Sequence, residues 1–280
     1  MTVRWVIAGV AAVLVAGQAV ASPVETERMT WTEIRDAVAA GKTTIIIPTG
    51  GTEQNGPHMI TGKHNFIVAE TARRIAATLG DALVAPVLAY VPEGDVAQRE
   101  GHMAYPGTIS VPPIVFSKVL KAAAESFKAH GFKLIVFLGD SGPNQEPQHQ
   151  VASDLSRAWA AEGVRVLNAD SYYAGNGQVE SLKAEGETDA AIGQHASIRD
   201  TSELMAVLPE GVRTDKFAAD ADGVSGDPRR ASAERGQKLL ELKVDAALRD
   251  IKSARERSSA AGPSAEDGGW FSRLLHWISG

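Results

Sequence analysis

Blocks of apolar and polar residues alternate along the chain and predict strands and helices in turn. Four short runs of β-branched and aliphatic residues are expected to be buried strands: 43–51, 82–91, 133–140 and 163–170. Helices are expected between them, at 66–80, 110–131 and about 148–161. Strand and helix in alternation predict an α/β fold, in which a mainly parallel sheet is covered by helices on both faces.

The alternation stops after Asp170. Residues from Tyr172 to Gly193 are polar and expected to be irregular, a helix follows Thr201, and a final helix is expected from about Ala231 to Ser253. Residues 258–269 have the composition of a linker, and 270–280 place six apolar residues on one helical face: Trp270, Phe271, Leu274, Leu275, Trp277 and Ile278. This helix is expected to dock on the protein's own body, on another subunit or on a membrane surface.

The first 21 residues have the pattern of a secretory signal peptide. Arg4 gives a basic start, an apolar run follows from Val6 to Ala16, and the small residues of Ala19-Val20-Ala21 predict cleavage before Ser22. The alternative is an uncleaved anchor, although the run is shorter than the roughly 20 residues that span a bilayer. We therefore predict an exported protein, periplasmic or secreted, whose main domain covers 22–257.

Charge and cysteine content exclude several classes of function. The net charge is −6 and no basic block is present, which argues against nucleic acid as a partner. The chain contains no cysteine, so disulfides, thiol catalysis and cysteine-bound zinc are all excluded.

Candidate chemistry gathers in the loops after two predicted strands. Ligands of parallel sheets bind beyond the carboxyl ends of the strands, and the loops after Ile47 and Leu138 both lie there. The first, GTEQNGPHMITGKHN, holds Glu53, His58 and His64, and the second begins with Asp140. Carboxylates and imidazoles together suit zinc, manganese or iron. Each residue also has a simpler interpretation, as a solvated loop residue or, for Asp140, a helix cap.

Two further stretches carry histidine beside turn residues. His102 lies in EGHMAYPGTIS, ahead of a Pro-Gly turn, and His195 and Asp200 lie in GQHASIRDTS, just before a predicted helix. Asp200 or Thr201 could instead cap that helix.

Five motifs, in this order, resemble those of the creatininase family of metal-dependent amidohydrolases. They read PTGGTEQNGPHMITGKH, EGHMAYPGTIS, LGDSGPNQ, HASIRDTS and GVSGDP, and the resemblance covers roughly residues 29 to 250. It implies a three-layer α/β/α sandwich that assembles as a homo-oligomer, commonly a hexamer, and hydrolyses C–N bonds of small-molecule substrates.

The resemblance also implies which positions bind metal, and there this chain departs from the family. The motif PxGSxExHGPHLPxxTD contributes its first acid, the following histidine and the final Asp, and NGHGGN contributes its histidine. Glu53 keeps the acid, but Asn55 replaces the histidine and His64 the Asp. The histidine of NGHGGN falls on Ser141, or on Asp140 if one residue is inserted.

Glu53, His64 and Asp140 still supply two carboxylates and one imidazole. We therefore predict one divalent ion, zinc or manganese, at a rearranged site with open positions. A metal-free pocket and a retained two-metal site are the alternatives. By resemblance, His195 is expected to pass a proton near the scissile amide. The remaining candidates for substrate binding or for support of the ligands are Asn55, His58, His102, Ser141, Asn144 and Asp200.

Together these observations predict an exported hydrolase that cleaves an amide-type C–N bond, cyclic amides included, with a metal-activated water. Glu53 and His195 are its predicted catalytic residues. The alternative function is a non-catalytic protein of the same fold that binds a small ligand or acts as a scaffold.

Overall fold

A computed structural model describes residues 23–260 of the chain. The predicted signal peptide, the amphipathic segment 270–280 and residues 261–269 of the predicted linker lie outside the described residues. Within 23–260, no helix is both long and apolar enough to cross a membrane.

The described residues fold around a four-stranded parallel sheet with the order β2-β1-β3-β4. The strands are β1 (Thr44–Thr49), β2 (Ala82–Val84), β3 (Leu134–Gly139) and β4 (Arg165–Asn168). β1 and β3 pair in register from Thr44 with Leu134 to Thr49 with Gly139. The two strands therefore end side by side, and the loops that follow them start at the same edge of the sheet.

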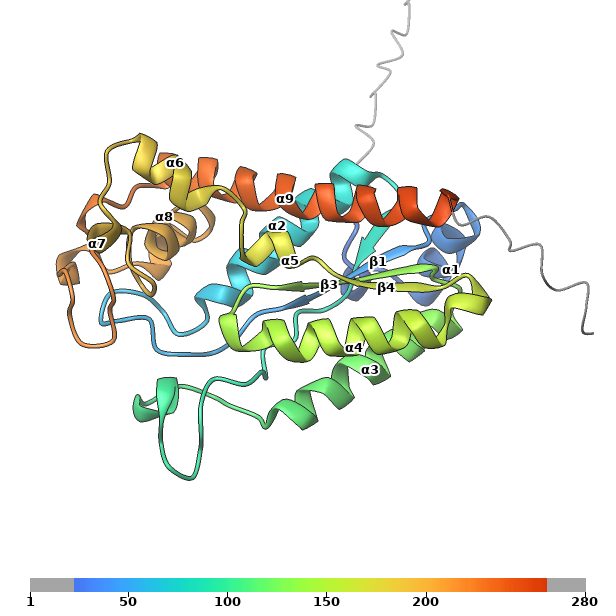
Figure 1. The fold of residues 1–280 in the computed structure, drawn as a ribbon, viewed down its shortest axis with the longest axis horizontal. Coiled ribbons are helices and arrows are strands. Elements are labelled where there is room, and N and C mark those ends of the chain that lie inside the picture. Colours follow the sequence, from blue (N-terminus) through green and yellow to red (C-terminus); the bar gives the residue numbers. More distant parts are fainter. Residues whose placement is uncertain (1–22, 261–280) are drawn as a thin grey trace, which may run out of the picture.

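Helices cover both faces of this sheet (Figure 1). α1 (Trp31–Ala39), α3 (Pro113–Ala129) and α4 (Gln145–Ala158) pack on one face. α2 (Lys63–Leu79), α5 (Asp170–Tyr173) and α9 (Ala233–Ala260) pack on the other. Three further helices lie beyond one end of the sheet: α6 (Gln178–Ala184), α7 (Asp189–Ile192) and α8 (Ile198–Val207). The predicted three-layer α/β/α sandwich is confirmed.

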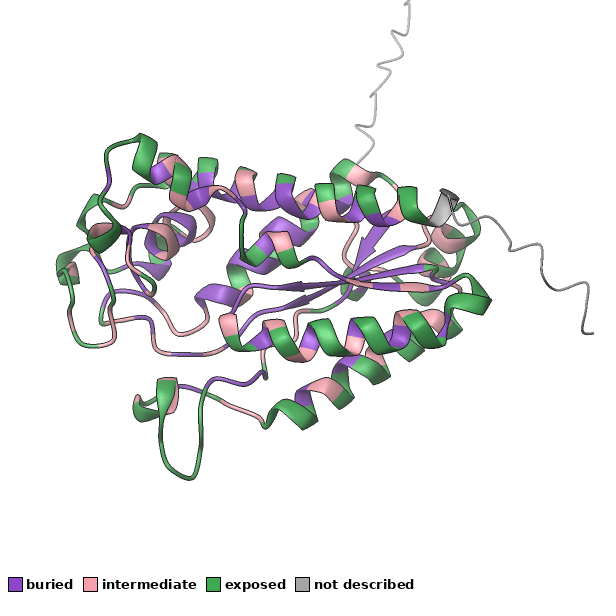
Figure 2. Ribbon diagram, viewed as in Figure 1, coloured by how far each residue is buried: buried purple, intermediate pink, exposed green. Residues whose placement is uncertain are grey.

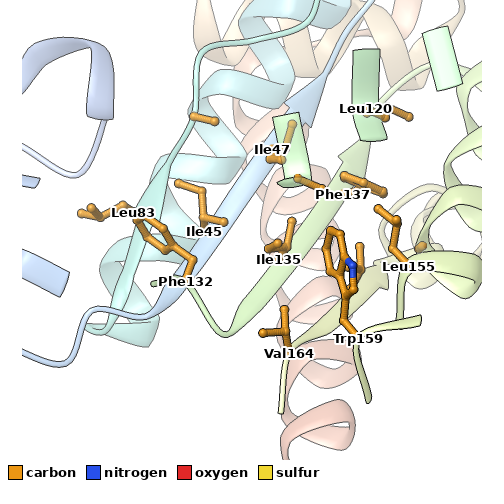
Figure 3. Close-up of a cluster of buried hydrophobic side chains, with 14 of the residues drawn as sticks. Ile45, Ile47, Leu83, Leu120, Phe132, Ile135, Phe137, Leu155, Trp159 and Val164 are labelled. Atoms are coloured by element: carbon orange, nitrogen blue, oxygen red, sulfur yellow. The ribbon is translucent and has the colours of Figure 1, made fainter. Parts of the chain in front are cut away.

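Alternating residues of the central strands fill two separate cores, because successive side chains of a strand point to opposite faces. Ile45, Ile47 and Phe137 pack with α3 and α4, as the close-up in Figure 3 shows, together with Trp159. Ile46 and its neighbours on that face pack against α2 and α9. Figure 2 shows the result: β1, β2 and β3 are buried along their length and β4 is buried at alternate residues, whereas the outer sides of the helices are exposed.

Several boundaries differ from the sequence prediction for local reasons. β2 ends at Val84, because Pro86 cannot donate a hydrogen bond to a neighbouring strand. α1 was not predicted, although a capping box between Thr30 and Glu33 marks its start. α6 and α7 fall within a stretch predicted to be irregular, and α9 continues to Ala260, into the predicted linker.

Candidate metal and catalytic site

The loop that follows β1 is buried at the carboxyl edge of the sheet, where sequence analysis placed the site. Glu53, at 2% exposure, lies in this loop, and His64, at 6%, lies in the first turn of α2. Asp140, at 3%, directly follows β3, and its backbone N–H donates to the carbonyl of Thr49 over 3.0 Å. The parallel register of β1 and β3 thus brings together residues that are far apart in the sequence.

His64 lies between the two acids with which it was predicted to bind metal. Its Nε2 is 2.8 Å from Oε1 of Glu53, and its Nδ1 is 2.7 Å from Oδ2 of Asp140. Two carboxylates accept only if both ring nitrogens donate, so the ring is an imidazolium. Burial and Lys63 oppose this charge, but Glu53 and Asp140 outweigh them and raise the pKa of His64 to about 9.

Two buried lysines extend this contact into a chain of alternating charges. Nζ of Lys63 lies 3.1 Å from Oδ1 of Asp200 and 3.9 Å from Oε1 of Glu53. Nζ of Lys243, from α9, lies 2.5 Å from Oδ1 of Asp140 and 3.2 Å from Oε2 of Glu203. Burial disfavours both ammonium groups, but the acids around them raise the pKa of each lysine above its ordinary value.

Neither lysine was predicted as a site residue from the sequence, and neither was Glu203. Lys63 is adjacent to His64, so its position in the loop motif could have indicated it. Lys243 and Glu203 lie within ordinary helical sequence and give no local signal.

A different group has the spacing of metal ligands: Glu53, His102 and His195, whose ligand atoms all lie within 4.8 Å of one another. Nε2 of His102 is 3.1 Å from Oε2 of Glu53, and Nδ1 of His195 is 3.8 Å from Oε1. The two rings lie with centroids 4.6 Å apart. Their side chains are 26% and 20% exposed, so solvent reaches this side of Glu53.

Gln54 sets the tautomers of both histidines. Nε2 of His195 donates to the backbone carbonyl of Gln54 over 3.0 Å, which leaves its Nδ1 with a lone pair directed at Glu53. The Gln54 amide, whose oxygen accepts from the N–H of Gly56, donates to Nδ1 of His102. The Nε2 proton of His102 therefore faces Glu53. For Nε2 to bind a metal ion, the ring must lose this proton and the side-chain amide of Gln54 must rotate.

Burial lowers the pKa of both rings, that of His195 to about 4. At neutral pH both are uncharged imidazoles, the form that binds metal. The carboxyl of Glu53 is ionised, because His64 and Lys63 outweigh the cost of its burial and hold its pKa far below the ordinary value.

The structure thus offers a second candidate ligand set beside the predicted one, and the two sets share Glu53. In this structure both nitrogens of His64 donate to carboxylates. Asp140 is held by Lys243 and by the hydroxyl of Tyr172. His102 was predicted near the pocket and His195 as a proton carrier, and the structure places both at ligand spacing from Glu53. A pKa of about 4 leaves His195 uncharged at neutral pH and able to accept a proton.

Three other predicted residues form hydrogen bonds around the site loop: Asn55, Asn144 and His58. Asn55 donates from Nδ2 to the backbone carbonyls of Glu53 and Ile60, which fixes the turn of the loop. Asn144 donates to the carbonyl of Gly50 over 2.8 Å. His58 bonds through Nε2 to Thr201, away from the ligand group, and packs edge-on against Phe217. The hydrogen bonds of these three residues go to the backbone or to Thr49 and Thr201, and not to a side chain of the ligand group.

Asp200 and Ser141 make closer contacts with the site. Asp200 accepts from the N–H of Ala196 over 2.7 Å as well as from Lys63, and so fixes the backbone beside His195. Ser141 donates to Oε2 of Glu93, a buried acid that sequence analysis missed. Burial and the charge of Glu53 raise the pKa of Glu93 to about 9, so this side chain is a neutral carboxylic acid next to Glu53. Its position in the turn PEGD at the same sheet edge was the available signal.

The family model described as creatininase (creatinine amidohydrolase) matches residues 27–251. Among curated proteins, a creatinine amidohydrolase of Pseudomonas putida is 26% identical over 242 residues, 77% of this chain and 91% of the relative. A mycofactocin precursor peptide peptidase of Mycolicibacterium smegmatis is 27% identical over 223 residues, 74% of this chain and 84% of the relative.

Solved structures have the same fold. A crystal structure of creatinine amidohydrolase has a TM-score of 0.69 at 23% identity, and the match covers 83% of this chain and 98% of the other. A structure named Creatininase Mn has a TM-score of 0.67 at 23% identity, with the same coverage. A creatininase variant of Zn-Zn type has a TM-score of 0.64 at 24% identity, also with the same coverage.

Proposed function

The chain belongs to the creatininase family, and on that premise we propose that it is a metal-dependent hydrolase of amide-type C–N bonds. The observation that carries the proposal is the ligand group: one carboxylate, from Glu53, and two neutral imidazoles, from His102 and His195, at metal-ligand spacing. Two nitrogens and one oxygen suit zinc or manganese, and three protein ligands leave positions open for reactants. The residues present therefore fit one divalent ion.

When bound, such an ion supplies Lewis-acid activation of a water molecule and of a carbonyl group. The protein supplies the charge and the orientation. Lys63 and His64 keep Glu53 ionised, and Asp200 and Gln54 fix the position and tautomer of His195. Glu93 keeps a proton on a carboxyl group beside Glu53 at neutral pH.

Two kinds of substrate are suggested by the relatives. One is named for creatinine, a cyclic amide, and the other for a precursor peptide. Both substrates are cleaved at a C–N amide bond, so we propose that class and a small-molecule or short-peptide substrate. Assembly as a homo-oligomer and export of the chain, with cleavage before Ser22, are further parts of this proposal; the small residues of Ala19-Val20-Ala21 support the cleavage.

Metal content separates the two ligand sets. Wild-type protein loaded with zinc or manganese and then dialysed is expected to retain one ion per chain by mass spectrometry, and Glu53→Ala and His195→Ala are expected to lose it. His64→Gln is expected to keep the ion, because this residue contacts Glu53 only as a hydrogen-bond donor. Ring opening of creatinine and release of amine from short linear amides should be seen only in the variants that retain the ion.

Loss of the ion in His64→Gln but not in His195→Ala would restore the ligand set predicted from sequence. Wild type that binds no more metal than Glu53→Ala would leave the alternative, a small-ligand-binding protein of the same fold. One observation favours that alternative: the buried acids already have organic cations as partners.

A further inference from the structure

We infer that Lys63 is a built-in cation in the place of a second metal ion, so that this site holds one ion and not two. The inference rests on the proposed function for the first ion. It starts from the burial of Lys63: the side chain is 1% exposed, and its ammonium group lies among carboxylates, at 3.1 Å from Asp200 and 3.9 Å from Glu53. Such a position, between the carboxylate oxygens of a buried acid and a partly buried one, is one in which a divalent cation would be stable.

The charges of the cluster balance without a second ion. Glu53, Asp140 and Asp200 are carboxylates, and each has an organic cation beside it, from Lys63, His64 or Lys243. Buried charges are stable only when they are paired. Because every acid of this inner group is already paired, a second divalent ion between Glu53 and Asp200 would place excess positive charge directly beside the Lys63 ammonium group, whose side chain is 1% exposed.

The position of the two cations in α2 shows how strongly the acids hold them. Lys63 and His64 are the first two residues of this helix, whose first turn contains no acidic residue. The positive end of the helix dipole disfavours cations there, and the burial of both side chains adds a further cost. Only the carboxylates of Glu53, Asp140 and Asp200 offset these costs, as a metal-ligand cluster would for an ion.

Sequence supports the same exchange. The family motif ends in Thr-Asp, and this chain has Lys63 and His64 at those positions. A neutral residue and an acid have both been replaced by cations, side by side. One related structure is of Zn-Zn type by its name.

Two substitutions of Lys63 test the inference as a matched pair. Lys63→Ala removes the charge and opens space between Glu53 and Asp200, whereas Lys63→Met removes the charge but fills the same space. Each protein is loaded with zinc or manganese and dialysed, and its ions are counted by mass spectrometry. We expect one ion per chain in wild type and in Lys63→Met, and two in Lys63→Ala. The melting temperature of Lys63→Ala should rise more on metal addition than that of wild type.

Two ions per chain in wild type would overturn the inference, as would equal counts in Lys63→Ala and Lys63→Met. A wild type without any ion and a Lys63→Ala variant with one would support it while refuting the proposed function. Circular dichroism of each variant, with and without metal, reports whether it folds. If neither variant folds, the count in wild type decides: fewer than two ions supports the inference and two refute it.

Discussion

Histidines of this site carry different charges because their surroundings differ. His64 donates to two carboxylates and is charged at neutral pH, with a pKa of about 9. His195 donates to a backbone carbonyl and lies farther from Glu53, so burial dominates and its pKa falls to about 4. One residue type thus provides a structural cation at one position and a lone-pair donor at the other.

The stability of the metal-free protein is expected to depend on pH through His64. Its pKa rises from 6.5 to about 9 on folding, so the stabilisation is complete below about pH 6.5 and is lost as pH rises through about 9. A shift of this size corresponds to on the order of 3 kcal/mol of unfolding free energy. Urea unfolding should therefore show a gap between wild type and His64→Gln that is large near pH 6 and small above pH 9.

His149→Gln is the control for that comparison, because His149 has a side chain that is 60% exposed. The free energy of unfolding of His149→Gln, measured with urea, should match that of wild type at every pH. A gap between wild type and His64→Gln that stays constant with pH would show that His64 is not held as an imidazolium.

At the scale of elements, the loops around the site depend on close backbone approach. Gly193 ends α7 with φ of +57°, and a Cβ there would lie 1.9 Å from the carbonyl oxygen of Ser225. That approach lets Ser225 accept from the N–H of Gln194 and donate to the carbonyl of His195. Gly193 thus allows the pairing that places the His195 ring beside Glu53.

Gly193→Ala is therefore expected to destabilise the protein by roughly 2 kcal/mol and to weaken metal binding at least tenfold. The matched control is Gly186→Ala. Gly186 also has a positive φ, +90°, but has open space where its Cβ would be. The free energy of unfolding of Gly186→Ala should therefore fall by about 1 kcal/mol, and its metal affinity should equal that of wild type. Thermal unfolding and calorimetric titration with zinc measure the two effects. Equal loss of metal affinity in both variants would contradict this role of Gly193.

At the scale of the molecule, the site forms at the carboxyl edge of the sheet from segments that are far apart in the sequence. Glu53 follows β1, Asp140 follows β3, Lys243 comes from α9 and His195 precedes α8. A third apolar cluster, which includes Met59, packs the site loop onto α8 and α9. The whole domain is therefore needed to assemble the cluster of charges.

Export can be tested on the whole protein. When the full chain is produced in a bacterial host, the mature protein is expected in the periplasmic or secreted fraction, with its N-terminus at Ser22, because Ala19 and Ala21 are small enough for the cleavage site. N-terminal sequencing of the purified protein measures this. An intact N-terminus at Met1 in the membrane fraction would indicate the uncleaved anchor instead.

Much of the fold followed from the sequence alone. The central strands, the helices over both faces and the sheet edge that carries the chemistry were predicted correctly, because buried strands and amphipathic helices have strong local patterns. Glu53 was also placed correctly, since its loop follows a clear strand. Short helices such as α6 and α7 have too few residues for a pattern to show.

The sequence by itself determined the family, the layers and the position of the acid Glu53. Tertiary structure alone decided which nitrogen lone pairs are free. His64 and His195 cannot be distinguished by residue type, and their roles depend on contacts with Asp140, across 76 residues, and with Gln54, across 141. Lys243 reaches Asp140 across 103 residues. Charge pairing of this kind is a property of three-dimensional neighbours, so no local pattern records it.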